Sequence, residues 1–151
     1  MYLRPIFAEF DIPTLRRFTR GNPLGTLITA LEPKPFPSIQ CTHLLWVLDV
    51  TDEDSSTELG TLRSHFAKAN PHCQAIVEDV QMRGPSNGSF EQEFCVLLNG
   101  PINSYVTPKF YVETKPTTGK VVPTWKFSAV QAYGKATFYF DTENPDTISF
   151  L

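Results

Sequence analysis

One continuous run of the sequence reads Gly119-Lys120-Val121-Val122-Pro123-Thr124-Trp125-Lys126-Phe127-Ser128-Ala129-Val130-Gln131-Ala132-Tyr133. Its first residues are typical of a turn, and the β-branched and aromatic residues that follow are typical of a strand. We predict a long, half-buried strand over about residues 121–140, bent at Gly134, with small or apolar residues at its even-numbered positions. The loop before this strand delivers a cation, Lys120, and a large aromatic, Trp125, which suits a flat, anionic ligand.

Short strands and turns are predicted for most of the remaining chain. Asp11 is a candidate cap for a helix over residues 12–20, and a second short helix is expected over 72–77. The other predicted strands cover residues 24–30, 41–50, 59–66, 94–98 and 103–106, with a solvated acidic loop at 51–58. Both faces of the predicted strand 41–50 are apolar, which favours a central position in the sheet. Asn99-Gly100-Pro101 is expected to end the predicted strand 94–98. Six strands with a few short helices predict an antiparallel β-barrel.

Composition limits the classes of function. The chain has 151 residues, of which 41% are hydrophobic, enough for one domain with a core. Its net charge of −3 is spread along the sequence, so direct binding to nucleic acid is not expected. There is no apolar run of ~18 residues, so no membrane association is expected. The three cysteines form no CxxC pair, which predicts reduced, mostly buried thiols and a cytoplasmic location.

Polar residues gather where the predicted strand 59–66 ends. Ser64, His65, Lys68 and Asn70 offer a cation, a hydroxyl and amide donors within seven residues, which is the chemistry that binds a phosphate. The alternative is an ordinary strand end, with a solvated Lys68 and a helix capped by Asn70. The three histidines, His43, His65 and His72, fit no tight metal-ligand spacing, so no metal site is expected. A histidine hydrogen-bonded at a strand end or in the core is favoured instead.

Four segments, taken in order, carry a family resemblance. They are residues 22–29, 42–44, 60–71, and the stretch from 100–101 through 105–108 into 119–127. Over roughly residues 1–140 the chain resembles the PaiB family of FMN-binding split-barrel proteins. The resemblance implies a six-stranded split barrel that forms a homodimer, with FMN bound in the groove between subunits. The sequence departs from the family at Lys126, usually Asn, and at Gln131, usually His. We expect a single split-barrel domain over residues 1–151, without the family's C-terminal helical part.

The resemblance also implies roles for individual residues. It places the FMN phosphate on Ser64, His65, Lys68 and Asn70, and the isoalloxazine ring in a groove lined by Thr26, Thr29, Thr42 and His43. Lys120 and Trp125 would close that groove from the partner subunit. The alternatives are a threonine-rich sheet face that needs no ligand, and an interface core for Trp125.

Three functions remain open on the sequence. The first is a flavin-dependent oxidoreductase or reductase-like activity on a small molecule, with His65 or Tyr133 as proton donor. The second is a PaiB-like negative regulator of transcription that acts through flavin or protein contacts. The third is a flavin-independent enzyme, of the cyclase or isomerase type, that uses the same pocket for a small organic substrate.

Overall fold

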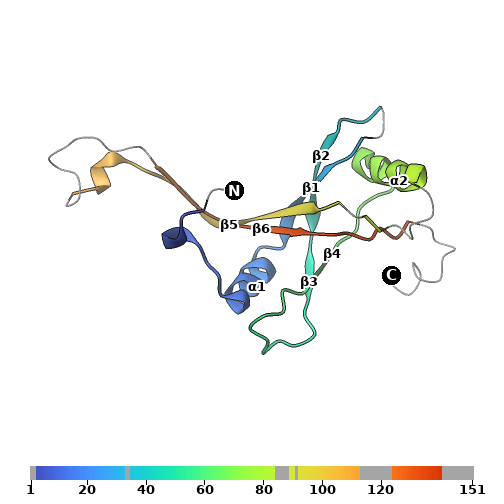
Figure 1. Ribbon diagram of the computed structural model, residues 1–151. Coiled ribbons are helices and arrows are strands. Elements are labelled where there is room, and N and C mark those ends of the chain that lie inside the picture. The colour runs from blue at the N-terminus through green and yellow to red at the C-terminus, as the bar shows by residue number, and fades with distance from the viewer. Residues whose placement is uncertain (1–2, 33–34, 84–88, 91, 113–123, 141–151) are drawn as a thin grey trace.

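The main sheet of the molecule has four strands in the order β2-β1-β5-β6 (Figure 1). The computed structural model describes residues 3–32, 35–83, 89–90, 92–112 and 124–140. The sheet is built from β1 (Leu24–Ala30), β2 (Ile39–Leu45), β5 (Phe94–Val106) and β6 (Thr124–Gly134). A second sheet pairs β3 (Val47–Asp49) with β4 (Thr61–Arg63), and the pairings in both sheets are antiparallel. The mainly β, antiparallel fold with six strands is therefore confirmed.

Helices complete the described part of the chain. They are α1 (Ile12–Gly21) and α2 (Pro71–Arg83), with short 3-10 turns η1 (Pro5–Phe7) and η2 (Pro108–Phe110). The predicted cap of α1 is confirmed, because the Asp11 carboxylate accepts a hydrogen bond of 2.9 Å from the Thr14 amide. No helix in the described ranges is long and apolar enough to cross a membrane.

The core lies between one face of the main sheet and α2. Alternate residues of β1 and β5 supply Leu27, Val96 and Leu98, and one face of α2 supplies Ala75, Ile76 and Val80. The remaining buried members are Leu31, Leu44, Phe90 and Phe94. Burying each large apolar side chain of this kind stabilises a fold by roughly 1.5–3 kcal/mol. The period of two on the strands and of three to four on α2 explains why these residues share one interior.

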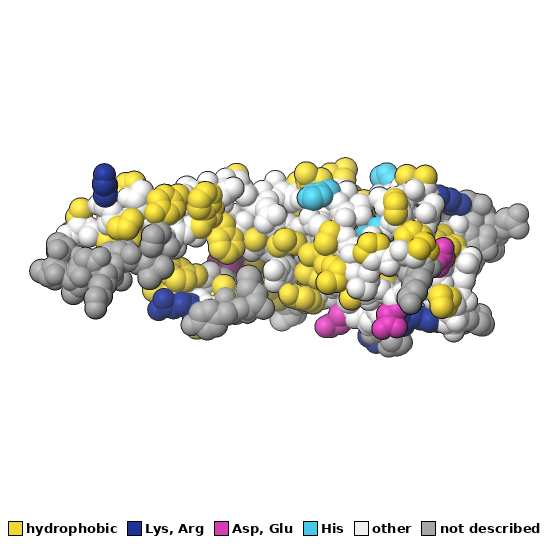
Figure 2. Space-filling model, turned by 90° about the horizontal axis from the view of Figure 1, so that it is seen from above, with side chains coloured by type: hydrophobic (Ala, Val, Ile, Leu, Met, Phe, Trp, Pro, Cys, Tyr) yellow, Lys and Arg dark blue, Asp and Glu magenta, His cyan; other side chains and the backbone are white. Residues whose placement is uncertain are grey.

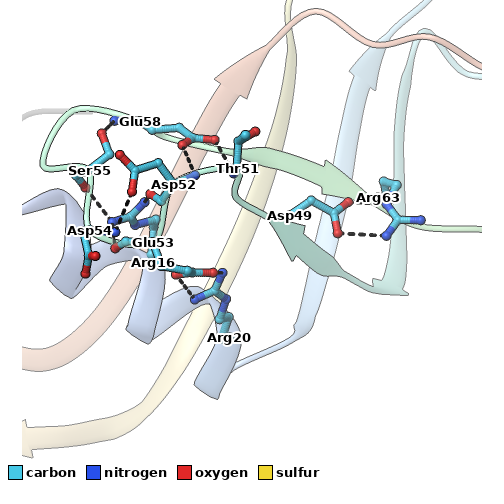
Figure 3. A network of polar contacts seen from close by, with 10 residues as sticks. All are labelled: Arg16, Arg20, Asp49, Thr51, Asp52, Glu53, Asp54, Ser55, Glu58 and Arg63. Atoms are coloured by element: carbon cyan, nitrogen blue, oxygen red, sulfur yellow. Dashed lines mark hydrogen bonds and ion pairs between the residues drawn. The ribbon is translucent and has the colours of Figure 1, made fainter.

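The acidic loop 51–58 is attached to α1 by hydrogen bonds and an ion pair. Arg16 is only 3% exposed, and its guanidinium donates to the backbone carbonyl oxygens of Asp52 (3.2 Å), Glu53 (3.0 Å) and Ser55 (2.6 Å), as Figure 3 shows. Arg20 forms an ion pair with Glu53, and the Glu58 carboxylate accepts two backbone amides within the loop. Hydrogen bonds to a charged group contribute more than neutral ones, so a buried arginine compensates its own desolvation here.

The predicted central strand 41–50 is wrong in two ways. The chain leaves the main sheet at Trp46, whose amide donates to Pro23 O (2.8 Å), so the segment divides into β2 and β3 in different sheets. β2 is also an edge strand of the main sheet. Its outward-facing apolar residues, Ile39 and Leu45, are 67% and 60% exposed, so nothing within the described chain covers them.

Other element boundaries also differ from the predictions. β5 continues through residues 99–101, where the pairing with β6 shifts between Asn99 and Asn103 instead of ending. β4 covers only residues 61–63, α2 runs on to Arg83, and β6 stops at Gly134. The three cysteines are free thiols, but Cys41 is exposed and the other two are half-buried, so the expectation of mostly buried thiols is wrong.

Candidate functional site

A fixed turn over residues 64–70, here called the 64–70 turn, joins β4 to α2. The Ser64 hydroxyl donates to Leu45 O at the end of β2 (2.7 Å), which brings the two strand ends together. The side-chain oxygen of Asn70 accepts the His72 amide (2.8 Å), so Asn70 caps α2. The alternative interpretation of Asn70 as a helix cap is thus confirmed. His65 and Lys68 are exposed on the same turn.

A side-chain cation lies on the turn just before α2. Lys68 is exposed and precedes Pro71, the first residue of α2, by three positions. Burial raises the pKa of the Cys73 thiol, and the positive charge of Lys68 opposes that rise. The first turn of a helix carries a partial positive charge that favours an anion, so a cation that precedes it suits a phosphate.

The four predicted groove residues of β1 and β2 lie on two faces of the sheet. Thr26 lies directly opposite His43, on the face that is not covered by α2, and His43 is exposed. Thr29 and Thr42 lie on the other face. Their hydroxyls form hydrogen bonds with the two ring nitrogens of His72, at 2.8 Å and 2.9 Å. The structure therefore brings Thr26 and His43 together near the end of β2, and it engages Thr29 and Thr42 in the interior.

His72 is a buried, hydrogen-bonded histidine, the interpretation that the sequence favours over a metal ligand. It is 2% exposed and bonded at both ring nitrogens. Burial lowers its pKa to about 4, so the ring is neutral at physiological pH. The signal was present in the sequence: His72, Ala75, Ile76, Asp79 and Val80 follow a helical period, and all five are buried. Within the described part of the chain, no three His, Cys, Asp or Glu side chains gather to hold a metal ion.

Trp125 lies far from the 64–70 turn within one chain. It is at the start of β6, on the arm that β5 and β6 form beyond the core, and Figure 1 shows this arm extending away from α2. Its indole N–H donates to the Asn103 side chain, and its ring packs 6.2 Å from Tyr105. The indole remains 56% exposed. Lys120, its predicted companion, lies outside the described residues.

Tyr133 faces a cavity of about 320 Å³ at the other end of β6. The cavity is mainly apolar and is lined by Ile28, Thr29, Ala30, Ile39, Glu93, Phe94, Cys95 and Tyr133. The Tyr133 hydroxyl donates to the Gln131 side chain (3.0 Å). The charge that the neighbouring Cys95 acquires as a thiolate raises the pKa of Tyr133, and burial adds to the rise. Tyr133 thus keeps its proton at neutral pH. The other predicted proton donor, His65, is exposed on the 64–70 turn.

The fold is that of a small, mainly β protein with antiparallel strands. The chain matches, over residues 1–149, the family described as "Putative FMN-binding domain", and it belongs to that family. The resemblance to PaiB proteins is thereby confirmed.

Relatives in fungi and bacteria support the assignment. The chain is 47% identical over 155 residues to an uncharacterized protein of Emericella nidulans, covering all of this chain and 62% of that protein. It is 47% identical over 160 residues to an uncharacterized protein of Aspergillus fumigatus, covering 100% and 61%. It is 25% identical over 153 residues to protease synthase and sporulation protein PAI 2 of Bacillus subtilis, covering 100% and 59%. The chain thus spans about three-fifths of the length of these relatives. No solved structure matches it.

The residues present fit FMN, the group that this family description names. A phosphate requires a cation and hydrogen-bond donors, and the 64–70 turn exposes Lys68 and His65. In the first turn of α2, Pro71 has no N–H and the His72 amide is bonded to Asn70, so the side chains of the turn are the main donors. The flat ring requires an apolar surface edged by polar groups, and the sheet face that carries Thr26 and His43 also carries the exposed Leu24 and Leu45. Ser64 links these two regions through its bond to Leu45 O.

Proposed function

We propose that this chain binds FMN, with the phosphate at the 64–70 turn and the ring on the sheet face that carries Thr26 and His43. The observation that carries the proposal is the exposed Lys68 on the 64–70 turn, three residues before α2 begins. Lys68 and the helix N-terminus neutralise the phosphate, while His65 and Asn70 contribute donors around it. The family description and the fit of the residues support the same ligand.

Comparison of FMN with riboflavin tests the phosphate contact, because riboflavin lacks only the phosphate. We expect the chain to bind FMN at least tenfold more tightly than riboflavin, and Lys68→Ala to remove most of that difference. Lys109→Ala, an exposed lysine on η2, is the matched control and should leave the difference unchanged. Equal affinities of the unaltered chain for the two flavins would refute a phosphate site at this turn.

In this proposal, two copies of the chain form the complete flavin groove as a homodimer. The arm of β5 and β6 exposes Ile102, Tyr105, Trp125 and Phe127, and η2 and the residues after it expose Phe110 and Val112. The outer face of the sheet exposes Leu24, Ile39, Leu45 and Tyr133, between 60% and 67%. Figure 2 shows hydrophobic side chains along the length of the molecule on the face it presents. An apolar surface of this extent suits an interface, and a second copy that covers it would also bring Trp125 to the flavin ring.

Oxidoreductase chemistry on a small molecule is the activity that we propose for the bound flavin, which supplies reversible acceptance of electrons or hydride. Tyr133 is the proton donor that we propose within the described chain, because it holds its proton at neutral pH and lines the apolar cavity. The cavity suits a small, mainly apolar substrate.

Steady-state oxidation of a dihydronicotinamide donor by the FMN-loaded protein, with a small-molecule electron acceptor, tests this activity. We expect Tyr133→Phe to lower the turnover rate at least tenfold while FMN affinity stays the same. Tyr139→Phe removes a hydroxyl from the same end of the chain and should have little effect. Full turnover in Tyr133→Phe would exclude Tyr133 as the donor, and His65→Gln then becomes the decisive variant.

A further inference from the structure

His72 connects three separate parts of the molecule. Its ring nitrogens bond the hydroxyls of Thr29 on β1 and Thr42 on β2, at 2.8 Å and 2.9 Å. Its backbone amide bonds the Asn70 side chain at the end of the 64–70 turn. The ring of Phe66, from the middle of that turn, packs edge-on against the imidazole with ring centres 5.9 Å apart. One residue therefore fixes both the turn and the start of α2 on two neighbouring strands.

The chemistry of the imidazole makes this connection specific. A neutral imidazole has one N–H donor and one acceptor nitrogen, and a threonine hydroxyl can serve in either role. Both bonds form when one hydroxyl donates and the other accepts. An apolar residue at position 72 leaves both hydroxyls unbonded, and Thr29 is only 2% exposed. Buried polar groups without partners are costly, so the interior favours a histidine at this position.

The other buried residues of α2 have a different role. Ala75, Ile76 and Val80 belong to the apolar core, against which Phe66 of the turn also packs. This packing holds the helix and Phe66 on the sheet, but it satisfies no polar group. His72 adds the hydrogen bonds that tie the turn and the start of α2 to Thr29 and Thr42.

We propose that His72 is a positioning residue for the phosphate site: it holds the 64–70 turn and the first turn of α2 in place against β1 and β2 without contacting the ligand. The part of this inference that concerns phosphate rests on the proposed function. The part that concerns the order of the turn does not, because it can be measured without a flavin. The family resemblance assigned Thr29 and Thr42 to the isoalloxazine ring of FMN. In this proposal they anchor the turn through their hydrogen bonds to His72.

Amide hydrogen exchange in the flavin-free protein tests the positioning role directly. We expect His72→Phe to increase exchange of the hydrogen-bonded amides of residues 70, 72 and 74 at least tenfold, while β1 and β5 keep their protection. Val80→Ala is the matched control, because it shortens a buried side chain eight positions farther along the same helix and breaks none of these hydrogen bonds. It should lower the melting temperature and leave exchange of the turn unchanged. Unchanged exchange of the turn in His72→Phe would overturn the proposal.

Flavin titrations then connect the position of the turn to binding. We expect His72→Phe to weaken FMN binding about tenfold and riboflavin binding less than twofold, because only FMN uses the turn. Equal weakening of both flavins would show a general loss of structure and would also count against the proposal. If the unaltered chain binds neither flavin, the proposed function fails, and the exchange measurement still decides the role of His72.

Two variants that change fewer contacts test the same proposal if His72→Phe does not fold. Thr42→Val and Thr29→Val each remove one hydroxyl partner and keep the shape of the side chain. Each should increase exchange of the 64–70 turn in the same direction as His72→Phe, by a smaller factor. Val80→Ala again serves as the control. Turn exchange equal to that of the unaltered chain in both threonine variants would contradict the proposal.

Discussion

Gly100 determines how closely α1 approaches the main sheet. A β-carbon at this position would overlap the Ser128 hydroxyl and come within 2.8 Å of two carbons of the Phe18 ring. Gly100 lies inside the irregular part of β5, so the strand accommodates α1 at the place where its pairing with β6 shifts. The sequence marked this glycine as the end of a strand, whereas the structure shows a close contact between a helix and a continuous strand.

We expect Gly100→Ala to destabilise the fold by about 1–3 kcal/mol, the usual cost of overpacking. Gly134→Ala is the control, because a β-carbon there meets no atom within 4 Å, and its stability should match that of the unaltered chain. Urea unfolding, with the slope checked for constancy, measures both variants. A midpoint for Gly100→Ala equal to that of the unaltered chain would show that α1 does not need this close approach.

His72 makes the stability of the fold depend on pH. Its pKa is lowered by burial from 6.5 to about 4, and the side chains that contact its ring, Thr29, Thr42 and Phe66, do not ionise. Above pH 6.5 neither the folded nor the unfolded state binds a proton here. As the pH falls from 6.5 toward 4, only the unfolded state binds it, so stability decreases, by about 3 kcal/mol in total.

Urea unfolding between pH 7.5 and 4.5 measures this dependence. We expect His72→Gln to be less stable at neutral pH but to lose less stability on acidification than the unaltered chain does. His65→Gln removes an exposed histidine and should retain the full decrease. The same acid dependence in His72→Gln and in the unaltered chain would assign the effect to other groups.

At the scale of elements, local sequence signals predicted those elements that local forces determine. The Asp11 cap and the Pro13 that follows it define the start of α1, and β1 has its predicted bounds because residues 24–30 are β-branched and apolar. The predicted loop at 51–58 is also present. Its attachment through a buried arginine was not predictable, since Arg16 looks like any other polar residue on a helix.

Long-range contacts explain the elements that were predicted wrongly. Trp46 turns the chain because its backbone and indole N–H groups bond Pro23 O and Gly25 O, 21–23 positions away. β5 continues past its glycine because β6 pairs on both sides of the irregularity. α2 extends to Arg83 because Ile76 and Val80 pack into the core. None of these partners is adjacent in the sequence, so a local pattern did not reveal them.

At the scale of the whole molecule, the sequence predicted the class of fold better than the arrangement of the site. The resemblance placed Thr26, Thr29, Thr42 and His43 in one groove, but only Thr26 and His43 share the outer face, because Thr29 and Thr42 bond His72 on a helix later in the chain. Trp125 lies on an arm directed away from the turn, so one chain alone does not bring the predicted residues together. In the proposed homodimer, two copies of the chain bring them together.

Sedimentation velocity of the chain mixed with FMN, recorded at the absorbance of the flavin, tests this account most directly, because it reports binding and assembly together. The account predicts that the flavin sediments with a particle of twice the mass of one chain, and that Trp125→Ala decreases the bound fraction more than Phe127→Ala does. Flavin that remains at the position of the free molecule, or that sediments with a single chain, would contradict it.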